Sequence, residues 1–242
     1  MSEVSVIQRP GQVRATLTGP ALSSDVVMVL TAALGLAERT PGVRAFVIAS
    51  DGPAFCTGMP LVGDRPTSAI LDGLALARDL LTGLARSPLV TVALVDGQVT
   101  GGGVAVAAAC DQVIAGPAAT FRITELLVGL LPAILLPVVA RRTGHHRAFS
   151  LALTAPLLNA AEAVGAGLAD RATANPEAEL ARMMRELGRT SPAAVAALKQ
   201  YRDTLHPDTG SLELAAEAMR ERLDDPSSRA RVSLLAECGL LS

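Results

Sequence analysis

The chain has 242 residues, half of them apolar, and a formal net charge of −2 at pH 7. This length suits one folded domain with a sizeable core, and the apolar content excludes a disordered segment. The near-neutral charge, the lack of a Lys/Arg block and the 2% aromatic content argue against nucleic acid as a partner.

No targeting or membrane signal is visible. The first residues, MSEVSV, lack the basic region and apolar run of a signal peptide. The most apolar stretch, 126–140, is too short to span a bilayer and contains two prolines, so we predict a buried helix there. Cys56, Cys110 and Cys238 have neither zinc-site nor disulfide-scaffold spacing. We therefore expect reduced thiols in a cytoplasmic protein.

Strand and helix patterns alternate over the first half of the chain. Residues 3–10 and 12–19 alternate in polarity and predict a strand pair that turns at Pro10-Gly11. Possible N-caps at 23–25 predict a helix that ends at Pro41-Gly42. Further strands are predicted at 44–50, 89–97 and 112–117, a loop at 51–68, and helices up to about Arg86 and over 104–110.

After Glu125 the patterns become almost entirely helical. Amphipathic segments without intervening strands cover 175–190, 191–205 and 211–223. The alternation before this point predicts an α/β fold with much parallel pairing. We expect residues 1–185 to form the core with the active site, and residues 186–242 to form a helical C-terminal region.

Two glycine-containing turns follow predicted strands. They are GPAFCTGMP (Gly52–Pro60) and the glycine triplet 101–103. Neither carries the Lys-Ser/Thr pair of a phosphate loop or the spaced glycines of a dinucleotide site. Two such turns at neighbouring strand ends could direct two backbone N–H groups at one point, an oxyanion hole for the enolate of a thioester.

Three segments resemble, in order and spacing, the core motifs of the crotonase (enoyl-CoA hydratase/isomerase) superfamily. They are VIASDGPAFCTGMPL, VDGQVTGGGVAVAAACD and ATFRITELLVGLLP. The resemblance covers roughly residues 3 to 175, and the likeness is greatest to the dehydratases of polyketide β-branching. It implies a spiral of ββα units with a helical C-terminal region used in trimer formation.

The resemblance also assigns the residues that bind the thioester oxygen. Met59, which follows Gly58 in FCTGM, and Gly102, which follows Gly101 in the glycine triplet, would donate the two backbone N–H groups. Asp64 and Arg65 either line the pocket mouth or are solvated, and the sequence leaves both readings open.

Hydratases of this family use two glutamates, and the chain keeps one of them. Ala105 occupies the first position and Glu125 the second, while Pro60 replaces the family's usual Asp. Glu125 is either a helix-start residue favoured by the helix dipole or an acid/base group whose pKa is raised by apolar neighbours. The family resemblance favours catalysis.

The other candidates for chemistry are weaker. We expect His145, His146 and His206 to be structural or surface residues, and Cys56 to be a buried filler. Lys199 is the only lysine, so the loop after the first oxyanion motif lacks the lysine that the related decarboxylases carry there. This favours dehydration over decarboxylation.

The resemblance thus implies a dehydratase that acts on a 3-hydroxy-3-methylglutaryl-type thioester of an acyl carrier protein. Glu125 would help the β-hydroxyl leave, a second proton-transfer group is unidentified, and no metal, nucleotide or flavin cofactor is implied. Two alternatives remain: a CoA-linked enoyl hydratase/isomerase with a single glutamate, or a crotonase-like assembly partner without activity. A homotrimer or hexamer is expected in each case.

Overall fold

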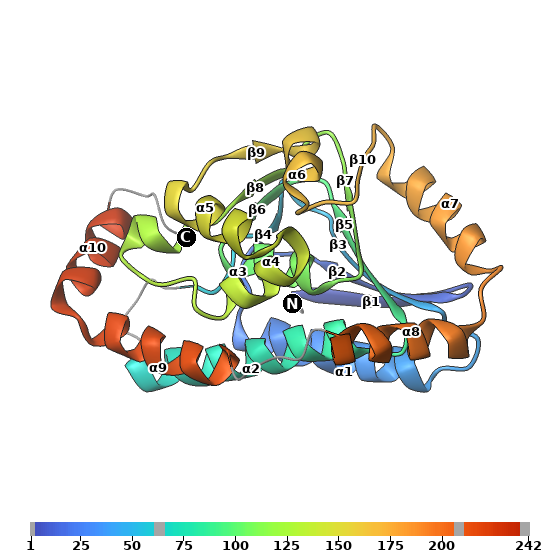
Figure 1. The fold of residues 1–242 in the computed structure, drawn as a ribbon, viewed down its shortest axis with the longest axis horizontal. Coiled ribbons are helices and arrows are strands. Elements are labelled where there is room, and N and C mark those ends of the chain that lie inside the picture. Colours follow the sequence, from blue (N-terminus) through green and yellow to red (C-terminus); the bar gives the residue numbers. More distant parts are fainter. Residues whose placement is uncertain (1–2, 61–65, 206–210, 238–242) are drawn as a thin grey trace.

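Two β-sheets form the framework of the computed structural model, which describes residues 3–60, 66–205 and 211–237 (Figure 1). The larger sheet has the strand order β1-β2-β3-β5-β7-β10. Its strands are β1 (Val4–Arg9), β2 (Gln12–Leu17), β3 (Ala45–Ser50), β5 (Val90–Val95), β7 (Gln112–Ala115) and β10 (Arg171–Ala172). The β1–β2 hairpin is antiparallel, and every other neighbouring pair in this sheet is parallel.

The smaller sheet consists of short strands in the order β4-β6-β8-β9. They are β4 (Ala54–Cys56), β6 (Gln98–Thr100), β8 (Thr120–Arg122) and β9 (Leu158–Asn159). The chain passes from β3 to β4 and then helix α2 (Thr67–Arg86), and from β5 to β6 and then helix α3 (Gly102–Ala109). Each pass adds one strand to each sheet and then a helix, so the predicted spiral of ββα units is confirmed.

The first helix, α1 (Ser24–Arg39), begins where the sequence predicts. The Ser23 side chain accepts a hydrogen bond from Val26 N at 3.2 Å, as an N-cap residue does. Its buried side chains recur with helical spacing and face the sheet: Val26, Val27, Leu30, Ala33, Leu34 and Ala37. The central strand β5 is buried along its whole length, which is typical of a parallel sheet covered on both faces.

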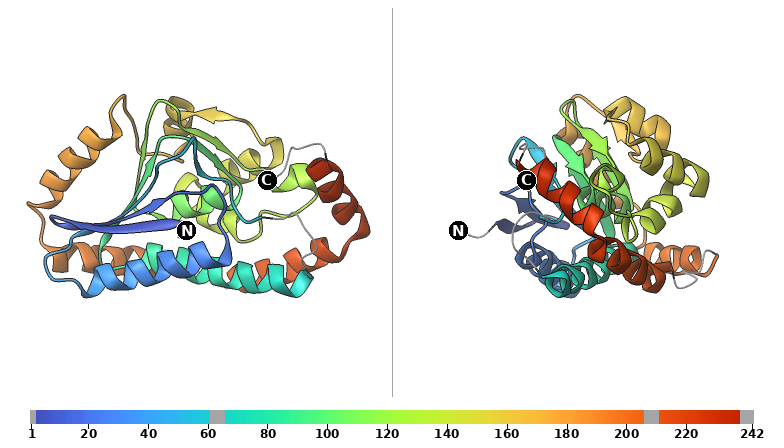
Figure 2. Two further views of the ribbon diagram at one scale, coloured as in Figure 1. Left: turned by 180° about the vertical axis from the view of Figure 1, so that it is seen from behind. Right: turned by 90° about the vertical axis from the view of Figure 1, so that its left-hand side faces the viewer.

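Helices dominate the second half of the chain. They are α4 (Leu135–Thr143), α5 (His145–Thr154), α6 (Ala160–Ala166), α7 (Pro176–Leu187), α8 (Pro192–Leu205), α9 (Ser211–Asp224) and α10 (Pro226–Glu237). Leu180 and Met183 of α7 pack on the face of the larger sheet that Val47 and Val92 form. Helix α7 and the α9–α10 pair lie at opposite ends of the long axis (Figures 1 and 2).

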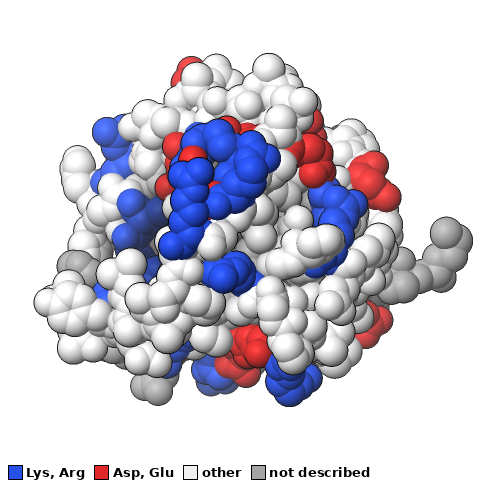
Figure 3. Space-filling view, turned by 90° about the vertical axis from the view of Figure 1, so that its right-hand side faces the viewer, with Lys and Arg blue, Asp and Glu red and all other residues white. Residues whose placement is uncertain are grey.

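Basic and acidic side chains lie together on the face at the α7 end (Figure 3). Arg182 pairs with Glu179 and with Glu186, each at 2.5 Å, and Arg171 also pairs with Glu179. This face therefore presents mixed charge.

The prediction of one buried helix over 126–140 was wrong. The structure has a four-residue 3-10 turn, η1 (Glu125–Val128), then a loop, and helix α4 begins only at Leu135. Gly129 ends η1 with a left-handed φ of 79°. Pro132 then follows in the loop, where it has no N–H to extend a helix. None of the described helices is long and apolar enough to cross a membrane.

The single lysine anchors helix α8 to the sheet framework. Lys199 is buried, its Nζ donates to Leu89 O at 2.8 Å, and it pairs with the Asp111 carboxylate. Asp111 also accepts hydrogen bonds from the backbone N and the hydroxyl of Thr91 and from Arg202. The charge of Lys199 is thus used to fix α8.

Candidate active site

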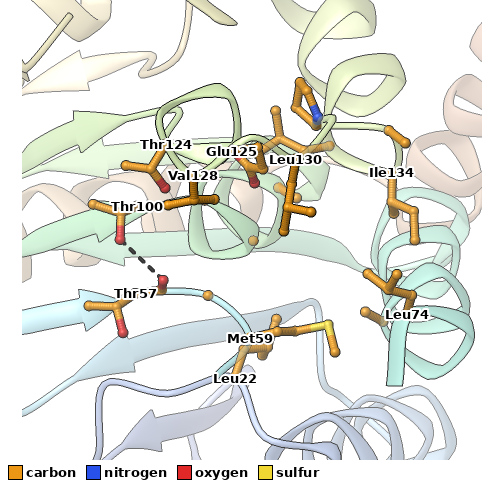
Figure 4. Close-up of a pocket in the computed structure, with 18 of the residues that line it drawn as sticks. Leu22, Thr57, Met59, Leu74, Thr100, Thr124, Glu125, Val128, Leu130 and Ile134 are labelled. Carbon is orange, nitrogen blue, oxygen red and sulfur yellow. Dashed lines mark hydrogen bonds between the residues drawn. The ribbon is translucent and has the colours of Figure 1, made fainter. Parts of the chain in front are cut away.

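A pocket of about 810 Å³ opens between the smaller sheet, α2, η1 and α9. Apolar side chains from α2, η1, the loop between η1 and α4, and α9 form much of its wall: Ile70, Leu74, Val128, Leu130, Ile134, Met219 and Leu223. Figure 4 shows Glu125, Val128 and Leu130 on one wall, with Thr57, Met59 and Leu22 on the opposite wall. Its size and lining are typical of small-ligand pockets.

The two glycine turns meet at this pocket. Gly58 has a φ of +88°, and a Cβ on it would lie 2.7 Å from Gly102 N. A Cβ on Gly102 would lie 3.6 Å from Met59 N. Gly102 is also the first residue of α3, where backbone N–H groups have no partner within the helix. The amides of Met59 and Gly102 therefore lie near one another at the pocket.

Neither of these two amides donates a hydrogen bond to an acceptor in the part of the chain that the structure describes. The turns around them are nevertheless held in place. Thr100 Oγ1 donates to Thr57 O at 3.1 Å, which ties the first turn to the second (Figure 4). Leu22 N donates to Gly58 O at 2.8 Å. The arrangement presents two fixed, unused donors to the pocket.

Glu125 lies beside the glycine triplet. Its Oε1 is 3.3 Å from the position that a Cβ on Gly101 would take, so a side chain at that position would meet the carboxyl group. Its Oε2 is buried and has no hydrogen-bond partner among the described residues. Burial raises the pKa of the Glu125 carboxyl, and the backbone amides of Glu125 and Thr124 oppose this only in part. A carboxylate in this state is a stronger base than an exposed glutamate.

Among the described residues that line the pocket, Glu125 is the only carboxylic acid. Ala105, which the sequence resemblance aligns with the family's first glutamate, lines the pocket and is buried. Arg122 and Arg231 are the lining residues of positive charge within the described ranges. Gly58, Gly101, Met59, Gly102 and Glu125, all predicted as site residues, are brought to this one pocket.

The remaining candidates lie elsewhere. Asp64, Arg65, His206 and Cys238 lie outside the described residues. His145 and His146 begin helix α5, are exposed and do not line the pocket.

The cysteines that the structure describes are not activated nucleophiles. Cys56 and Cys110 are buried, and desolvation raises their thiol pKa values to about 11 and about 12. Residues 3–60, 66–205 and 211–237 contain no group of His, Cys, Asp and Glu side chains placed to hold a metal ion.

Sequence reasoning missed the contribution of the last two helices. Met219 and Leu223 of α9 and Arg231 of α10 line the pocket. The i, i+4 spacing of Met219 and Leu223 marks one face of a helix, but this pattern does not say what that face covers.

Comparison with known proteins agrees with the fold. The enoyl-CoA hydratase/isomerase family model matches residues 12–228. The bacillaene synthase dehydratase PksH of Bacillus subtilis is 32% identical over 162 residues, which are 66% of this chain and 62% of that protein. The alignment thus spans less than two thirds of PksH.

Solved structures extend the likeness to the whole fold. An enoyl-CoA hydratase from Mycobacterium avium has a TM-score of 0.86 and 26% identity, covering 98% of this chain and 97% of that one. The Bacillus subtilis pksH structure has a TM-score of 0.84 and 23% identity, covering 99% and 98%, and shows the shared fold. The protein is an enzyme of the enoyl-CoA hydratase type. The chain belongs to the enoyl-CoA hydratase/isomerase family, within the crotonase superfamily and close to its polyketide dehydratases.

Proposed function

We propose that the protein dehydrates a 3-hydroxy-3-methylglutaryl-type thioester, carried by an acyl carrier protein, to the α,β-unsaturated thioester. One observation carries this proposal: two unused backbone donors, Met59 N–H and Gly102 N–H, lie in the same pocket as one buried carboxyl group, Glu125. Donors fixed in this way stabilise the negative oxygen of an enolate, and a nearby base is what enolate formation requires.

A single carboxyl group can serve both proton transfers. The Glu125 carboxylate takes the proton from C2, and the electrons of the C–H bond move into the thioester carbonyl, whose oxygen is held by the two amides. The enolate then reforms the carbonyl as the C3–O bond breaks, and Glu125 returns the same proton to the departing hydroxyl, which leaves as water. Glu125 ends ionised, as it began, so Ala105 needs no proton-transfer role.

The choice of dehydration and of a carrier rests on further observations. The relative PksH is named a bacillaene synthase dehydratase, and the pksH structure is described as that of a polyketide biosynthesis enoyl-CoA hydratase. Lys199 is paired with Asp111 and is not part of the pocket lining, so no described lysine is available there for a decarboxylase-like role. We therefore favour dehydration, and we expect the carrier-bound substrate to have a higher kcat/KM than the CoA ester.

The test uses the purified protein with the same acyl group on a carrier protein and on CoA, and mass spectrometry to follow the loss of water. Glu125→Gln keeps the shape but removes the acid/base function, so turnover should fall by ~10²–10⁴-fold with the fold intact. Glu38→Gln, an exposed position on α1, is the matched control.

Each alternative predicts a different result. Equal or better turnover of the CoA ester would support a CoA-linked hydratase. A wild-type protein that turns over neither ester would contradict the proposed substrate class. If Glu125→Gln dehydrates its substrate at a near-normal rate, Glu125 is only a turn residue.

We also propose that the chain assembles as a trimer or as a pair of trimers. Large apolar side chains are exposed on and just after α5, among them Phe149 at 56%, Leu153 at 59% and Leu157 at 61% exposure. Such side chains favour association when they gather on one face. Light scattering at micromolar concentration should give a trimer or hexamer mass, and a monomer mass would contradict the proposal.

A further inference from the structure

The Glu125 carboxyl group depends on its backbone for its position. Its Oε2 has no hydrogen-bond partner among the described residues, and Thr124 makes no side-chain cap to the turn. Catalytic groups usually owe their geometry to hydrogen bonds from neighbouring side chains. Here the placement of the carboxyl group must come mainly from η1, a single 3-10 turn of four residues.

Backbone hydrogen bonds from the two residues after η1 close the turn. The amides of Gly129 and Leu130 both donate to Glu125 O, the latter at 2.9 Å. Gly129 can do this because its φ of +79° folds the chain back, a conformation that glycine adopts at little cost. The orientation of Glu125 is therefore coupled directly to the position of Gly129.

The outer side of the turn is held by the two C-terminal helices. Gly129 O accepts hydrogen bonds from Arg222 Nε and Nη2, both at 3.1 Å, and from Ser228 Oγ at 2.9 Å. Arg222 Nη2 also donates to Ser228 Oγ at 2.6 Å. Arg231 Nε donates to Leu127 O at 2.6 Å. Four donor atoms from α9 and α10 thus converge on two carbonyls of this turn and its end.

The carbonyl of Gly129 has more protein hydrogen-bond donors than it needs to be satisfied. A surface carbonyl can be satisfied by water, yet Gly129 O is met by an arginine and by Ser228, which is 1% exposed. The same two segments also share a buried apolar cluster, in which Val128 and Leu130 pack with Met219 and Leu223. Polar and apolar contacts therefore fix η1 against α9 and α10 together.

We propose that Arg222 and Ser228 are positioning residues: through Gly129 O they hold the turn that carries Glu125 in its reactive orientation. The C-terminal helices then complete the active site of their own chain. This inference rests on the proposed role of Glu125 as the proton-transfer group, and it adds residues that touch neither substrate nor reacting atoms.

The test measures turnover and the local stability of the turn in the full-length protein. Arg222→Met removes both donors to Gly129 O, and Ser228→Ala removes the third. Because small misplacements of a catalytic group are costly, each variant should lower kcat by about 10- to 100-fold. The KM should change by less than about twofold, since the substrate contacts stay in place. Hydrogen exchange at the Gly129 and Leu130 amides should become faster.

Two further variants separate positioning from general stability. Arg222→Lys keeps one charged donor and should recover part of the lost kcat. Arg220→Met changes an exposed arginine on the same helix and should leave kcat and amide exchange as in the wild type. Exchange of the substrate's C2 proton in deuterated water, followed by mass spectrometry, reports proton removal even when no water is lost.

The outcomes distinguish the two proposals. A normal kcat in Arg222→Met and Ser228→Ala, with or without faster amide exchange, would overturn the positioning role alone. If the wild type exchanges the C2 proton of the substrate but loses no water, the dehydratase proposal is overturned. The rates of C2 proton exchange in the variants would then still decide the positioning role. A wild-type protein that shows neither reaction would overturn both.

Discussion

Gly58→Ala is the sharpest test of the two backbone donors. Gly58 has a φ of +88°, and a Cβ added there would lie 2.7 Å from Gly102 N and 3.3 Å from Thr100 O. The first distance is shorter than a Cβ can approach a backbone nitrogen without movement of one of them. The new methyl group would thus displace the Gly102 amide or cover it, and the oxyanion would lose this donor.

The loss can be estimated from what one such donor contributes. Removal of a single oxyanion donor lowers kcat by about 10²–10³-fold. The positive φ adds a separate cost, because a side chain in the left-handed region destabilises the fold by roughly 1–2 kcal/mol. Gly42→Ala is the matched control: its φ is +80°, but nothing lies within 4 Å of the added Cβ.

Steady-state turnover of the carrier-bound substrate and thermal unfolding of both variants separate these two effects. Both variants should lower the Tm, whereas only Gly58→Ala should lower kcat. A Gly58→Ala protein that is folded and has near-normal kcat would refute the assignment of Gly102 N–H as a donor to the substrate. Equal losses of kcat in Gly58→Ala and Gly42→Ala would refute the argument from the close approach.

Three further predictions concern the pocket. Folding raises the pKa of Glu125, so the favourable contribution of this group to the free energy of unfolding is present at low pH and is lost as the pH rises through the raised pKa. The free energy of unfolding of Glu125→Gln, measured in urea, should therefore increase relative to that of the wild type as the pH rises. Met219→Ala should raise kcat/KM for substrates with a bulkier apolar substituent, whereas Leu214→Ala, exposed on the same helix, should not. Ala105→Glu should lower the Tm, because it overpacks the pocket wall and buries a charge.

The elements with a strong repeating pattern were predictable from the sequence. Helix α1 has an N-cap at Ser23 and an apolar stripe, and its predicted end at Pro41-Gly42 lies just beyond Arg39. The buried strands β3 and β5 are short apolar runs bounded by polar and turn residues. These local signals coincide with the tertiary structure, so propensity and packing act in the same direction.

The smaller sheet was not predictable in this way. β4 and β6 have three residues each and β9 has two, too few for an alternating pattern to emerge. These strands form because the spiral of ββα units brings them side by side. The stretch after Thr124 was mistaken for one helix because its apolar content outweighed the signals for a break at Gly129 and Pro132.

The candidate site was predictable only where a motif carried it. Met59, Gly102 and Glu125 were predicted through family motifs, and the structure brings all three to one pocket. The close approach of Gly102 N explains why glycine is needed at Gly58. The role of Arg222 could not be found because its partner, Gly129 O, is a backbone atom that leaves no trace in the sequence. Contacts between a side chain and a distant carbonyl have no periodicity and no residue-type signature.

With Ala105 in place of a second glutamate, Glu125 is the only carboxylic acid among the described lining residues, and this should be visible in the pH dependence of the reaction. Two-carboxylate sites that need one group ionised and the other protonated give bell-shaped profiles. Here the proposed cycle begins and ends with ionised Glu125, so kcat/KM should rise along a single acidic limb. Because burial raises the pKa of Glu125, that limb should lie above the range of an exposed glutamate. It should be absent from the residual activity of Glu125→Gln, and a second limb in the wild type at alkaline pH would show that another titrating group takes part.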